Sequence, residues 1–293
     1  KQISCEMAGI SVIDYLDLYR KFTYTNQESY RLDHIAFVEL GQRKVDHNEF
    51  ENFKDFYTKD WQKFIDYNIV DVELVSRLEE KMKLIELAVA LAYDAKVNMQ
   101  DVYYQVRMWD TLIYNFLNKK GIVVPPGKRS DKDEKYAGAY VKEPIAGRYN
   151  WVVSFDLNSL YPHLIMQYNI SPETLVEKRH PSATVNGLLS QKVKVPKEFC
   201  LCANGAQYRK DIHGFLPEMM KKIYDERVQS KKLMILAKQE YEKTPTKELE
   251  KSISKYNNIQ MARKIQLNSA YGAIGNQYFR FYNIINAEAI TLS

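Results

Sequence analysis

The fold of this 293-residue chain is read most directly from residues 263–272, which have the sequence RKIQLNSAYG. Lys264, Asn268 and Tyr271 are spaced four and three apart, so they share one stripe of a helix that Gly272 ends or bends. A tyrosine on such a stripe usually belongs to a core, but lysine and asparagine are rarely buried without a partner. The stripe is therefore expected to face a polar ligand or water.

This stripe belongs to the second of two long helical segments, predicted at residues 217–243 and 247–271. Pro217 suits the first turn of a helix and Pro245 lies in the connection, so the two segments form an αα-hairpin. Residues 217–264 contain twelve Lys/Arg and seven Asp/Glu, a net charge of +5 that equals the formal charge of the whole chain. A charged hairpin is often only a solvated pair of helices laced with salt bridges.

Three cations of this hairpin are predicted to lie at one level. Arg227 and Lys231 are four residues apart, on one face of the first helix. Arg227 is 18 residues before Pro245 and Lys264 is 19 residues after it, so two antiparallel helices of equal rise bring them side by side. Cations held together repel one another unless an anion lies between them. A triphosphate suits a planar guanidinium and two ammonium groups.

A second informative stretch, residues 154–162, reads SFDLNSLYP. A strand expected at residues 151–155 delivers Asp156 to the point where a helix begins. Asp156 can cap that helix. It can equally bind a divalent cation, since Mg²⁺ is typically held by one or two carboxylates together with substrate phosphates. The free N–H groups of residues 159–161, at the helix start, can donate to phosphate oxygens.

Composition and local patterns bound the rest of the chain. Hydrophobic residues make up 45% and charged residues 27%, which is typical of a globular protein, and no apolar run is long enough to span a membrane. Cys5, Cys200 and Cys202 are an odd number, which argues against a disulfide framework and for a reducing compartment. The further predicted elements are a short helix capped by Ser11, a long helical stretch at 60–94, a helix at 100–119, a linker at 125–135, a strand at 136–141, and β-hairpins with loops at 177–214.

Two patterns carry a resemblance to a known family. The pattern D-L-x-S-L-Y-P at residues 156–162 and the pattern K-x3-N-S-x-Y-G at residues 264–272 resemble the first two polymerase motifs of the family B DNA polymerases. The pair Tyr67-x3-Asp71 resembles the third exonuclease motif of that family. The segments that resemble its T-even-type phage branch in particular are residues 12–27, 67–72, 136–149 and 170–174.

The resemblance implies an α+β, largely helical fold made of parts of three domains: an RNase H-like exonuclease domain, a palm and αα-hairpin fingers. It implies an internal piece of a longer polymerase. The implied boundaries are residues 1–84 for the C-terminal part of the exonuclease domain, 85–128 for a crossing helical segment and linker, 129–214 for the first part of the palm, 215–276 for the fingers and 277–293 for the start of the second part of the palm.

The resemblance also implies roles at the polymerase site. Asp156 and the Leu157 carbonyl would bind the catalytic Mg²⁺ ions, and Lys264 would act on the triphosphate during catalysis. Tyr161 would be the steric gate that excludes a 2′-hydroxyl. The implied nucleotide-binding residues are Ser159, Leu160, Tyr161, Arg227, Lys231, Lys264 and Asn268, and the implied template and base-pair residues are Ser269, Tyr271 and Gly272. His163 departs from the family pattern, which commonly has Ser at this place.

At the exonuclease site the resemblance implies that Asp71 binds a metal ion and that Tyr67 orients the attacking water. The implied partners are primer–template DNA, dNTPs and a sliding clamp, in the cytoplasm of an infected bacterium and without a membrane. The implied activity is template-directed DNA synthesis with 3′–5′ proofreading.

Two family features are absent from this sequence: the third polymerase motif, Y-G-D-T-D-S, and the first two exonuclease motifs. Two-metal phosphoryl transfer needs ligands on both sides of the reacting phosphate, so this chain holds half of each site and is expected to be inactive alone. A non-catalytic nucleic-acid-binding module and one chain of a split polymerase remain as alternatives. Asp156 and Tyr161 argue against the first, because a pure binder needs neither a strand-end carboxylate nor a steric gate.

Overall fold

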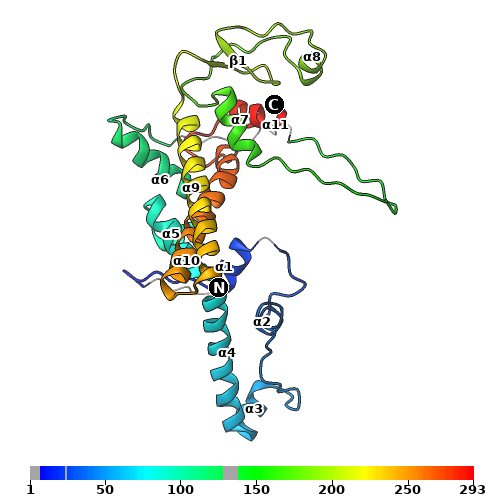
Figure 1. Cartoon of the computed structure of the whole chain (residues 1–293), viewed down its shortest axis with the longest axis vertical. Helices are drawn as coiled ribbons and strands as arrows, with labels where there is room; N and C mark the ends of the chain where they lie inside the picture. Colours follow the sequence, from blue (N-terminus) through cyan, green and yellow to red (C-terminus); the bar gives the residue numbers. More distant parts are fainter. Residues whose placement is uncertain (1–6, 24, 128–137) are drawn as a thin grey trace. The chain divides into compact units, whose positions relative to one another are not determined.

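The computed structural model describes residues 7–23, 25–127 and 138–293, and the chain is largely helical, as predicted (Figure 1). No helix formed by these residues combines the length and the apolar character needed to cross a membrane. The chain divides into two compact units. Unit 1 comprises Lys1–Ala92 and Asn98–Tyr103, and unit 2 comprises Tyr93–Val97 and Tyr104–Ser293.

The first part of the chain is built from short helices around one long one. Its elements are α1 (Tyr15–Phe22), α2 (Leu32–Leu40), α3 (Phe53–Lys59), α4 (Trp61–Met82), α5 (Leu84–Ala95) and the 3₁₀ helix η1 (Met99–Tyr103). The predicted cap at Ser11 is wrong. Asp14 caps α1 instead, through a 2.7 Å hydrogen bond from the Leu16 N–H to Asp14 Oδ1. A carboxylate also interacts favourably with the positive end of the helix dipole, which Ser11 cannot do.

The prediction of one continuous helix over residues 60–94 is also wrong, because the helix is interrupted at Lys83. Lys83 adopts a left-handed conformation with φ of 56°, which ends α4 and lets α5 start in a new direction. The break allows α5 to bury its own apolar side chains, among them Leu87 and Leu91. A lysine in the sequence does not predict a left-handed conformation, so we attribute the interruption of the helix to tertiary packing.

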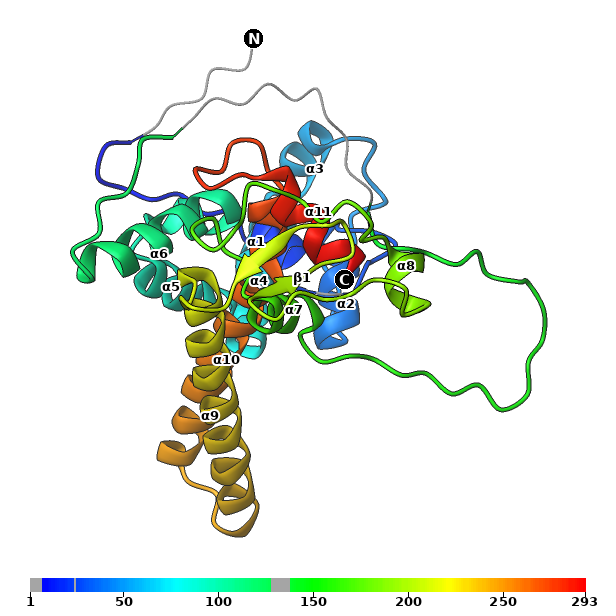
Figure 2. The ribbon, with the colours of Figure 1, turned by 90° about the horizontal axis from the view of Figure 1, so that it is seen from above.

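Unit 2 is organised around two long antiparallel helices. Its elements are α6 (Gln105–Lys119), α7 (Leu160–Tyr168), α8 (Val185–Leu189), β1 (Phe199–Leu201), β2 (Gln207–Arg209), α9 (Phe215–Lys243), α10 (Lys247–Ile274) and α11 (Ile284–Leu292). Helices α9 and α10 lie side by side in both views, which confirms the predicted αα-hairpin (Figures 1 and 2). Thr246 caps α10, with its Oγ1 accepting a 3.3 Å hydrogen bond from the Leu249 N–H.

Between α8 and α9 the predicted β-hairpin is present. Strands β1 and β2 pair antiparallel, with Cys200 opposite Tyr208. Cys202 follows β1 and is buried, and its N–H donates a 2.9 Å hydrogen bond to the Ala206 carbonyl. Burial raises the pKa of the Cys202 thiol to about 12, although a hydrogen bond with Ser293 lowers it slightly. Cys5 lies outside the described residues.

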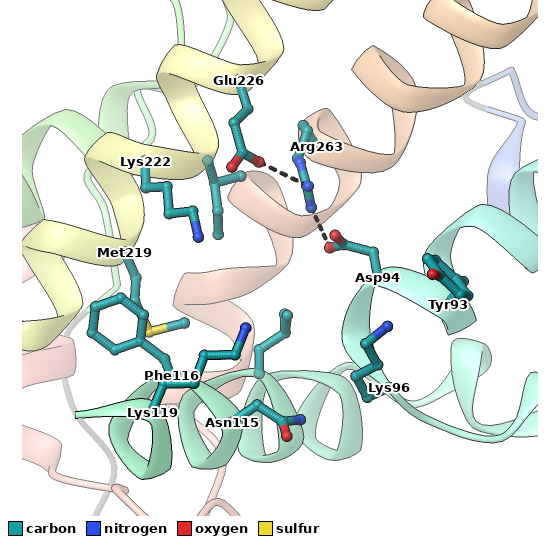
Figure 3. A pocket seen from close by; sticks show the side chains of 12 residues that line it. Tyr93, Asp94, Lys96, Asn115, Phe116, Lys119, Met219, Lys222, Glu226 and Arg263 are labelled. Atoms are coloured by element: carbon teal, nitrogen blue, oxygen red, sulfur yellow. Dashed lines mark hydrogen bonds and ion pairs between the residues drawn. The ribbon is translucent and has the colours of Figure 1, made fainter. Parts of the chain in front are cut away.

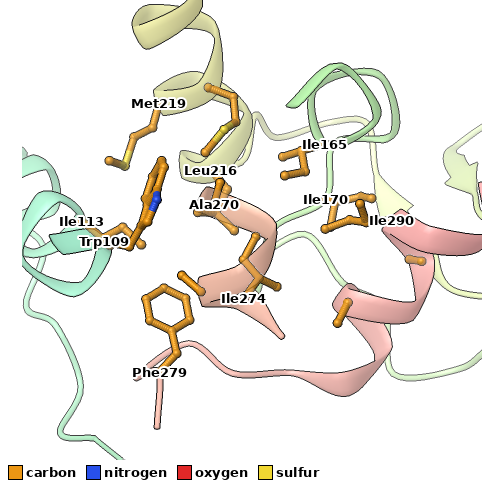
Figure 4. Packing of buried hydrophobic residues seen from close by; sticks show 14 of the residues in the cluster. Trp109, Ile113, Ile165, Ile170, Leu216, Met219, Ala270, Ile274, Phe279 and Ile290 are labelled. Atoms are coloured by element: carbon orange, nitrogen blue, oxygen red, sulfur yellow. The ribbon is translucent and has the colours of Figure 1, made fainter. Parts of the chain in front are cut away.

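One hydrophobic core holds unit 2 together. Side chains from α6, α7, α9, α10 and α11 meet in it, and Trp109 and Ile274 are almost fully buried there (Figure 4). The Trp109 indole N–H also donates a 3.0 Å hydrogen bond to Ser269 Oγ, so the core satisfies its one buried indole donor. This packing fixes the C-terminal half of α10 against α6.

The predicted strand at residues 151–155 is wrong for the described part of the chain. Trp151 is 98% exposed and Phe155 is 93% exposed, and the segment 138–158 has no regular secondary structure. A strand exists only when its backbone pairs with a neighbour, and in the described part of the chain the only sheet is the two-stranded one formed by β1 and β2. Of the strand predicted at residues 136–141, residues 138–141 are irregular and the first two lie outside the described residues, as does most of the predicted linker.

Candidate functional site

A pocket of about 370 Å³ lies where the turn before α7 meets α9 and α10. It brings together eight of the residues that the sequence singled out. The lining residues are Asp156, Leu157, Asn158, Ser159, Leu160, Tyr161, Pro162, Arg227, Lys264, Leu267 and Asn268. These come from three segments far apart in the sequence, so the αα-hairpin is what assembles the pocket.

The turn before α7 has an unusual backbone. Ser159 is the N-cap of α7 and adopts a left-handed conformation with φ of 55° and ψ of 45°. A non-glycine residue pays on the order of 1 kcal/mol for this conformation. The Ser159 side chain makes no capping hydrogen bond. Instead its Oγ accepts a 3.1 Å hydrogen bond from Arg227 Nη1. The first-turn N–H groups of α7 therefore have no side-chain cap, which suits them to bind an anion.

Two aromatic rings link α7 to α10 at the edge of this pocket. The Tyr161 and Tyr271 ring centroids are 4.7 Å apart with an interplanar angle of 45°. Both side chains are half-buried. The contact holds the Tyr161 ring beside the stripe that also carries Lys264 and Asn268, so the tyrosine has little freedom to swing away from the pocket.

The charges in the pocket are two cations and one carboxylate. Arg227 and Lys264 both line it, which agrees with the side-by-side placement expected from their distances to Pro245. Lys231 does not line it: this side chain lies one turn further along α9 and is exposed. Asp156 is exposed at the pocket, in an irregular segment rather than at the end of a strand.

The donor groups around Asp156 fit one side of a magnesium site. Within the described parts of the chain, no cluster of three or more His, Cys, Asp or Glu side chains could hold a metal ion by itself. One carboxylate in a pocket that two cations also line is, however, the kind of partial shell that Mg²⁺ completes with substrate phosphates. The residues present therefore fit a metal that arrives with a phosphorylated ligand.

The residues predicted to line the template differ in exposure: Ser269 is buried, Tyr271 is half-buried and Gly272 is exposed. Ser269 is buried, with its Oγ donating a 2.9 Å hydrogen bond to the Gln266 carbonyl in addition to accepting from Trp109. Gly272 is exposed, and a Cβ at this position would lie 2.9 Å from Gln105 Oε1. That oxygen is at the end of a flexible side chain, so a larger residue at position 272 requires only that the Gln105 side chain moves.

Unit 1 holds a second constellation, around Asp71. Lys44 Nζ forms a 2.6 Å ion pair with Asp71 Oδ2 and donates a 2.5 Å hydrogen bond to the Tyr67 hydroxyl. The other carboxylate oxygen, Asp71 Oδ1, is buried and has no hydrogen-bond partner among the described residues. Burial disfavours the Lys44 ammonium, but its hydrogen bonds to Asp71 and Tyr67 outweigh burial and raise its pKa. The carboxylate is therefore held in place with one oxygen still unsatisfied.

Sequence reasoning missed Lys44 and the packing of His163. Lys44 lies 23 residues before Tyr67 in an irregular segment, where no periodicity or motif marks it. His163 Nδ1 lies 2.9 Å from the Ser159 carbonyl oxygen, and its ring contacts Tyr224 edge-on with centroids 4.8 Å apart. His163, at the place where the family pattern commonly has Ser, therefore packs between α7 and α9.

Comparison with known proteins gives consistent matches. The chain is 34% identical to the DNA-directed DNA polymerase of Escherichia phage RB69 and 33% identical to that of Enterobacteria phage T4, in each case over 97% of this chain and 36% of the relative. It is 27% identical to DNA polymerase 1 of Sulfolobus acidocaldarius, over 97% of this chain and 32% of that protein. The chain thus spans about a third of the length of these curated relatives.

The family model described as DNA polymerase family B matches residues 98–293, a stretch that includes α7, the αα-hairpin and every residue of the pocket. Together with one-third identity to the phage enzymes over nearly the whole chain, this match shows that the chain belongs to family B of the DNA polymerases.

Proposed function

We propose that this chain is part of a DNA-directed DNA polymerase that carries out template-directed nucleotidyl transfer in phage DNA replication, and that the pocket before α7 binds the incoming dNTP. One observation carries the proposal: the uncapped start of α7, the cations Arg227 and Lys264, and the carboxylate of Asp156 line a single pocket.

Each part of the pocket suits one part of a nucleotide. Arg227 and Lys264 bind the phosphate oxygens, with the first-turn N–H groups of α7 from Leu160 onward donating to the same group. The Tyr161 ring lies under the sugar and excludes a 2′-hydroxyl, held by its contact with Tyr271. Asn268 completes the phosphate side, as does Lys231 if α9 shifts toward the ligand, and Ser269, Tyr271 and Gly272 border the base pair.

The reaction joins the primer 3′-hydroxyl to the α-phosphate and releases pyrophosphate. Bound Mg²⁺, held by Asp156 and the Leu157 carbonyl, would neutralise charge on the triphosphate and favour ionisation of the attacking hydroxyl. Lys264 stabilises the negative charge that develops on the leaving phosphates. Because only one carboxylate of the expected pair is in this sequence, the 293-residue chain is inactive on its own.

A proofreading 3′–5′ exonuclease function is proposed for unit 1. The support is the unsatisfied Asp71 Oδ1, which suits a metal ion, next to the Tyr67 hydroxyl, which can orient a water. Lys44 holds both groups in position through its ion pair and hydrogen bond.

The proposed domains are residues 1–84 for the exonuclease, 85–128 for the crossing segment, 129–214 and 277–293 for the palm, and 215–276 for the fingers. The proposed partners are primer–template DNA, dNTPs and a sliding clamp, in the cytoplasm of an infected bacterium.

A chimeric enzyme tests the function. This chain replaces the matching segment of the phage RB69 polymerase, and primer extension is measured with Mg²⁺. The chimera is expected to extend the primer, and Asp156→Asn is expected to lower its rate by about a thousandfold or more. Asp211→Asn, at an exposed carboxylate outside the pocket, serves as the control and leaves the rate unchanged. Extension by Asp156→Asn at the parental rate contradicts the proposal and favours a non-catalytic role for the pocket.

A further inference from the structure

A cluster of charged side chains joins the αα-hairpin to Asp94 (Figure 3), and none of its residues lines the pocket before α7. Arg263 on α10 is at its centre, with a side chain only 16% exposed. Its Nη2 forms a 2.7 Å ion pair with Glu226 on α9, and its Nη1 forms an ion pair with Asp94. Gln266 completes the set, donating a 2.7 Å hydrogen bond to Asp94 and accepting a 3.0 Å hydrogen bond from Arg263. We name these four residues the anchor cluster.

The anchor cluster and the pocket use neighbouring residues in the sequence. Glu226 immediately precedes Arg227 on α9, and Arg263 immediately precedes Lys264 on α10. Successive residues of a helix point about 100° apart, so one member of each pair can face the cluster while the next faces the pocket. Both helices therefore meet through an ion pair at the same level at which they present their two cations to the ligand.

This placement controls the register of the two helices. Helices α9 and α10 are 29 and 28 residues long and are joined through a short connection at the far end of the hairpin. A slip of one residue between them would move a side chain by about 1.5 Å along the axis. Such a shift is enough to break a charge-assisted hydrogen bond, whose length is confined to about 2.7–2.9 Å. The Glu226–Arg263 ion pair opposes this slip, and Asp94 ties the same guanidinium to the segment Tyr93–Val97 of unit 2.

We propose that Arg263 is a positioning residue: by binding Glu226 and Asp94 together, it holds Arg227 and Lys264 in the register that a triphosphate requires. The inference rests on the proposed dNTP-binding function of the pocket. Arg263 is not one of the residues that line the pocket, and it acts through the two cations that follow the paired residues. Its planar fork reaches two carboxylates on separate segments, which a lysine cannot do equally well.

The test measures binding of dGTP and of inorganic tripolyphosphate to the 293-residue chain by calorimetry. Arg263→Met is expected to weaken both affinities by about tenfold, which is the scale of one charge-assisted hydrogen bond. Arg263→Lys is expected to weaken both affinities less than Arg263→Met does. Glu226→Gln keeps the side-chain shape and is expected to weaken both affinities by about threefold to tenfold. The double variant, Arg263→Met with Glu226→Gln, is expected to bind about as weakly as Arg263→Met alone, because Arg263→Met already removes the ion pair that Glu226→Gln weakens.

The control is Arg280→Met. Arg280 is 26% exposed and pairs with Asp110 through contacts of 2.8 Å and 3.2 Å in the same unit, but away from the pocket. Thermal unfolding of every variant is recorded alongside. If Arg263 is a positioning residue, Arg263→Met and Arg280→Met should lower the melting temperature to a similar extent. Only Arg263→Met should weaken the binding of dGTP and tripolyphosphate. Equal affinity losses in the two variants would mean that Arg263 is merely structural and would overturn the inference.

The outcomes also separate this inference from the proposed function. Lys264→Ala is measured in the same series. If it weakens binding and Arg263→Met does not, the pocket stands and the positioning role is wrong. If the unaltered chain binds neither probe, or Lys264→Ala has no effect, the proposed function fails and the inference fails with it. If Arg263→Met does not fold, the near-isosteric Glu226→Gln decides, and an unchanged affinity there counts against the inference.

Discussion

Arg227 Nη1 donates a 3.1 Å hydrogen bond to Ser159 Oγ and so connects the middle of α9 to the first residue of the α7 turn. The two residues are separated by 68 positions in the sequence. The bond gives the guanidinium a polar partner when the pocket holds no anion. A phosphate can replace that partner without moving Arg227 far, which explains how the pocket keeps its cation oriented.

Replacing Arg227 by lysine should therefore harm binding although the charge is kept. We expect Arg227→Lys to weaken dNTP affinity by about threefold to tenfold, because a lysine cannot bind two phosphate oxygens in a planar fork. Calorimetric titration with dGTP measures the change. Arg209→Lys is the matched control, since it makes the same change at an exposed arginine outside the pocket and should leave the affinity unchanged. An Arg227→Lys variant that binds as tightly as the unaltered chain would refute the bidentate contact.

Removing the Tyr161 ring should relax sugar discrimination more than it lowers dNTP incorporation. The ring is proposed to lie where an added 2′-hydroxyl would clash, so Tyr161→Ala relieves repulsion against the wrong substrate. In the RB69 chimera we expect the ratio of kcat/KM for ATP to that for dATP to rise by about tenfold or more. Tyr278→Ala, at a tyrosine that is 80% exposed, should leave the ratio unchanged. An unaltered ratio in Tyr161→Ala would rule out the steric gate.

The buried Cys202 thiol should make stability depend on pH. Its pKa is about 12 in the folded chain against an ordinary value of 9.0. Above about pH 9 the unfolded chain loses this proton while the folded chain keeps it, so stability falls by up to about 1.4 kcal/mol per pH unit until the folded pKa is reached. Cys202→Ala should show a shallower fall. Urea unfolding between about pH 8 and pH 11 compares the slopes, and equal slopes would show that the thiol does not contribute.

The 293-residue chain alone should support neither primer extension nor primer degradation. The sequence contains one carboxylate of the expected pair at the polymerase site and the third exonuclease motif only. Assays with Mg²⁺ or Mn²⁺ should give no turnover above background. Activity that survives repurification and disappears in Asp156→Ala would contradict this expectation.

The αα-hairpin and the placement of Arg227 and Lys264 at one pocket could be predicted because both depend on local rules, whereas Lys231, predicted at the same level, does not line that pocket. Pro217 and Pro245 limit the two helices, and helical rise places Arg227 opposite Lys264 whatever the rest of the chain does. The predicted limits lie within three residues of the observed ends of α9 and α10.

The strand at residues 151–155 and the helix break at Lys83 could not be predicted in the same way. A strand depends on a partner strand, which can lie anywhere in the chain. The left-handed backbone conformation of Lys83 depends on tertiary packing. The Lys44–Asp71 ion pair and the anchor cluster likewise join residues distant in sequence, with no shared period to reveal them. Motif similarity predicted the candidate reactive residues, but it did not predict the side chains that contact them.

The central claim is that the turn before α7 and the αα-hairpin together form a dNTP site, and the affinity of Lys264→Ala for dGTP tests it most directly. The claim predicts that this variant binds dGTP about one to two decades more weakly than the unaltered chain, since a charge-assisted hydrogen bond contributes about 1.5–3 kcal/mol. Lys232→Ala, at an exposed lysine of α9 outside the pocket, should bind dGTP normally, and neither change should alter the affinity for duplex DNA appreciably. If Lys264→Ala instead weakens duplex binding, reduces its salt dependence and leaves dGTP affinity unchanged, Lys264 contacts the DNA backbone and the claim is wrong.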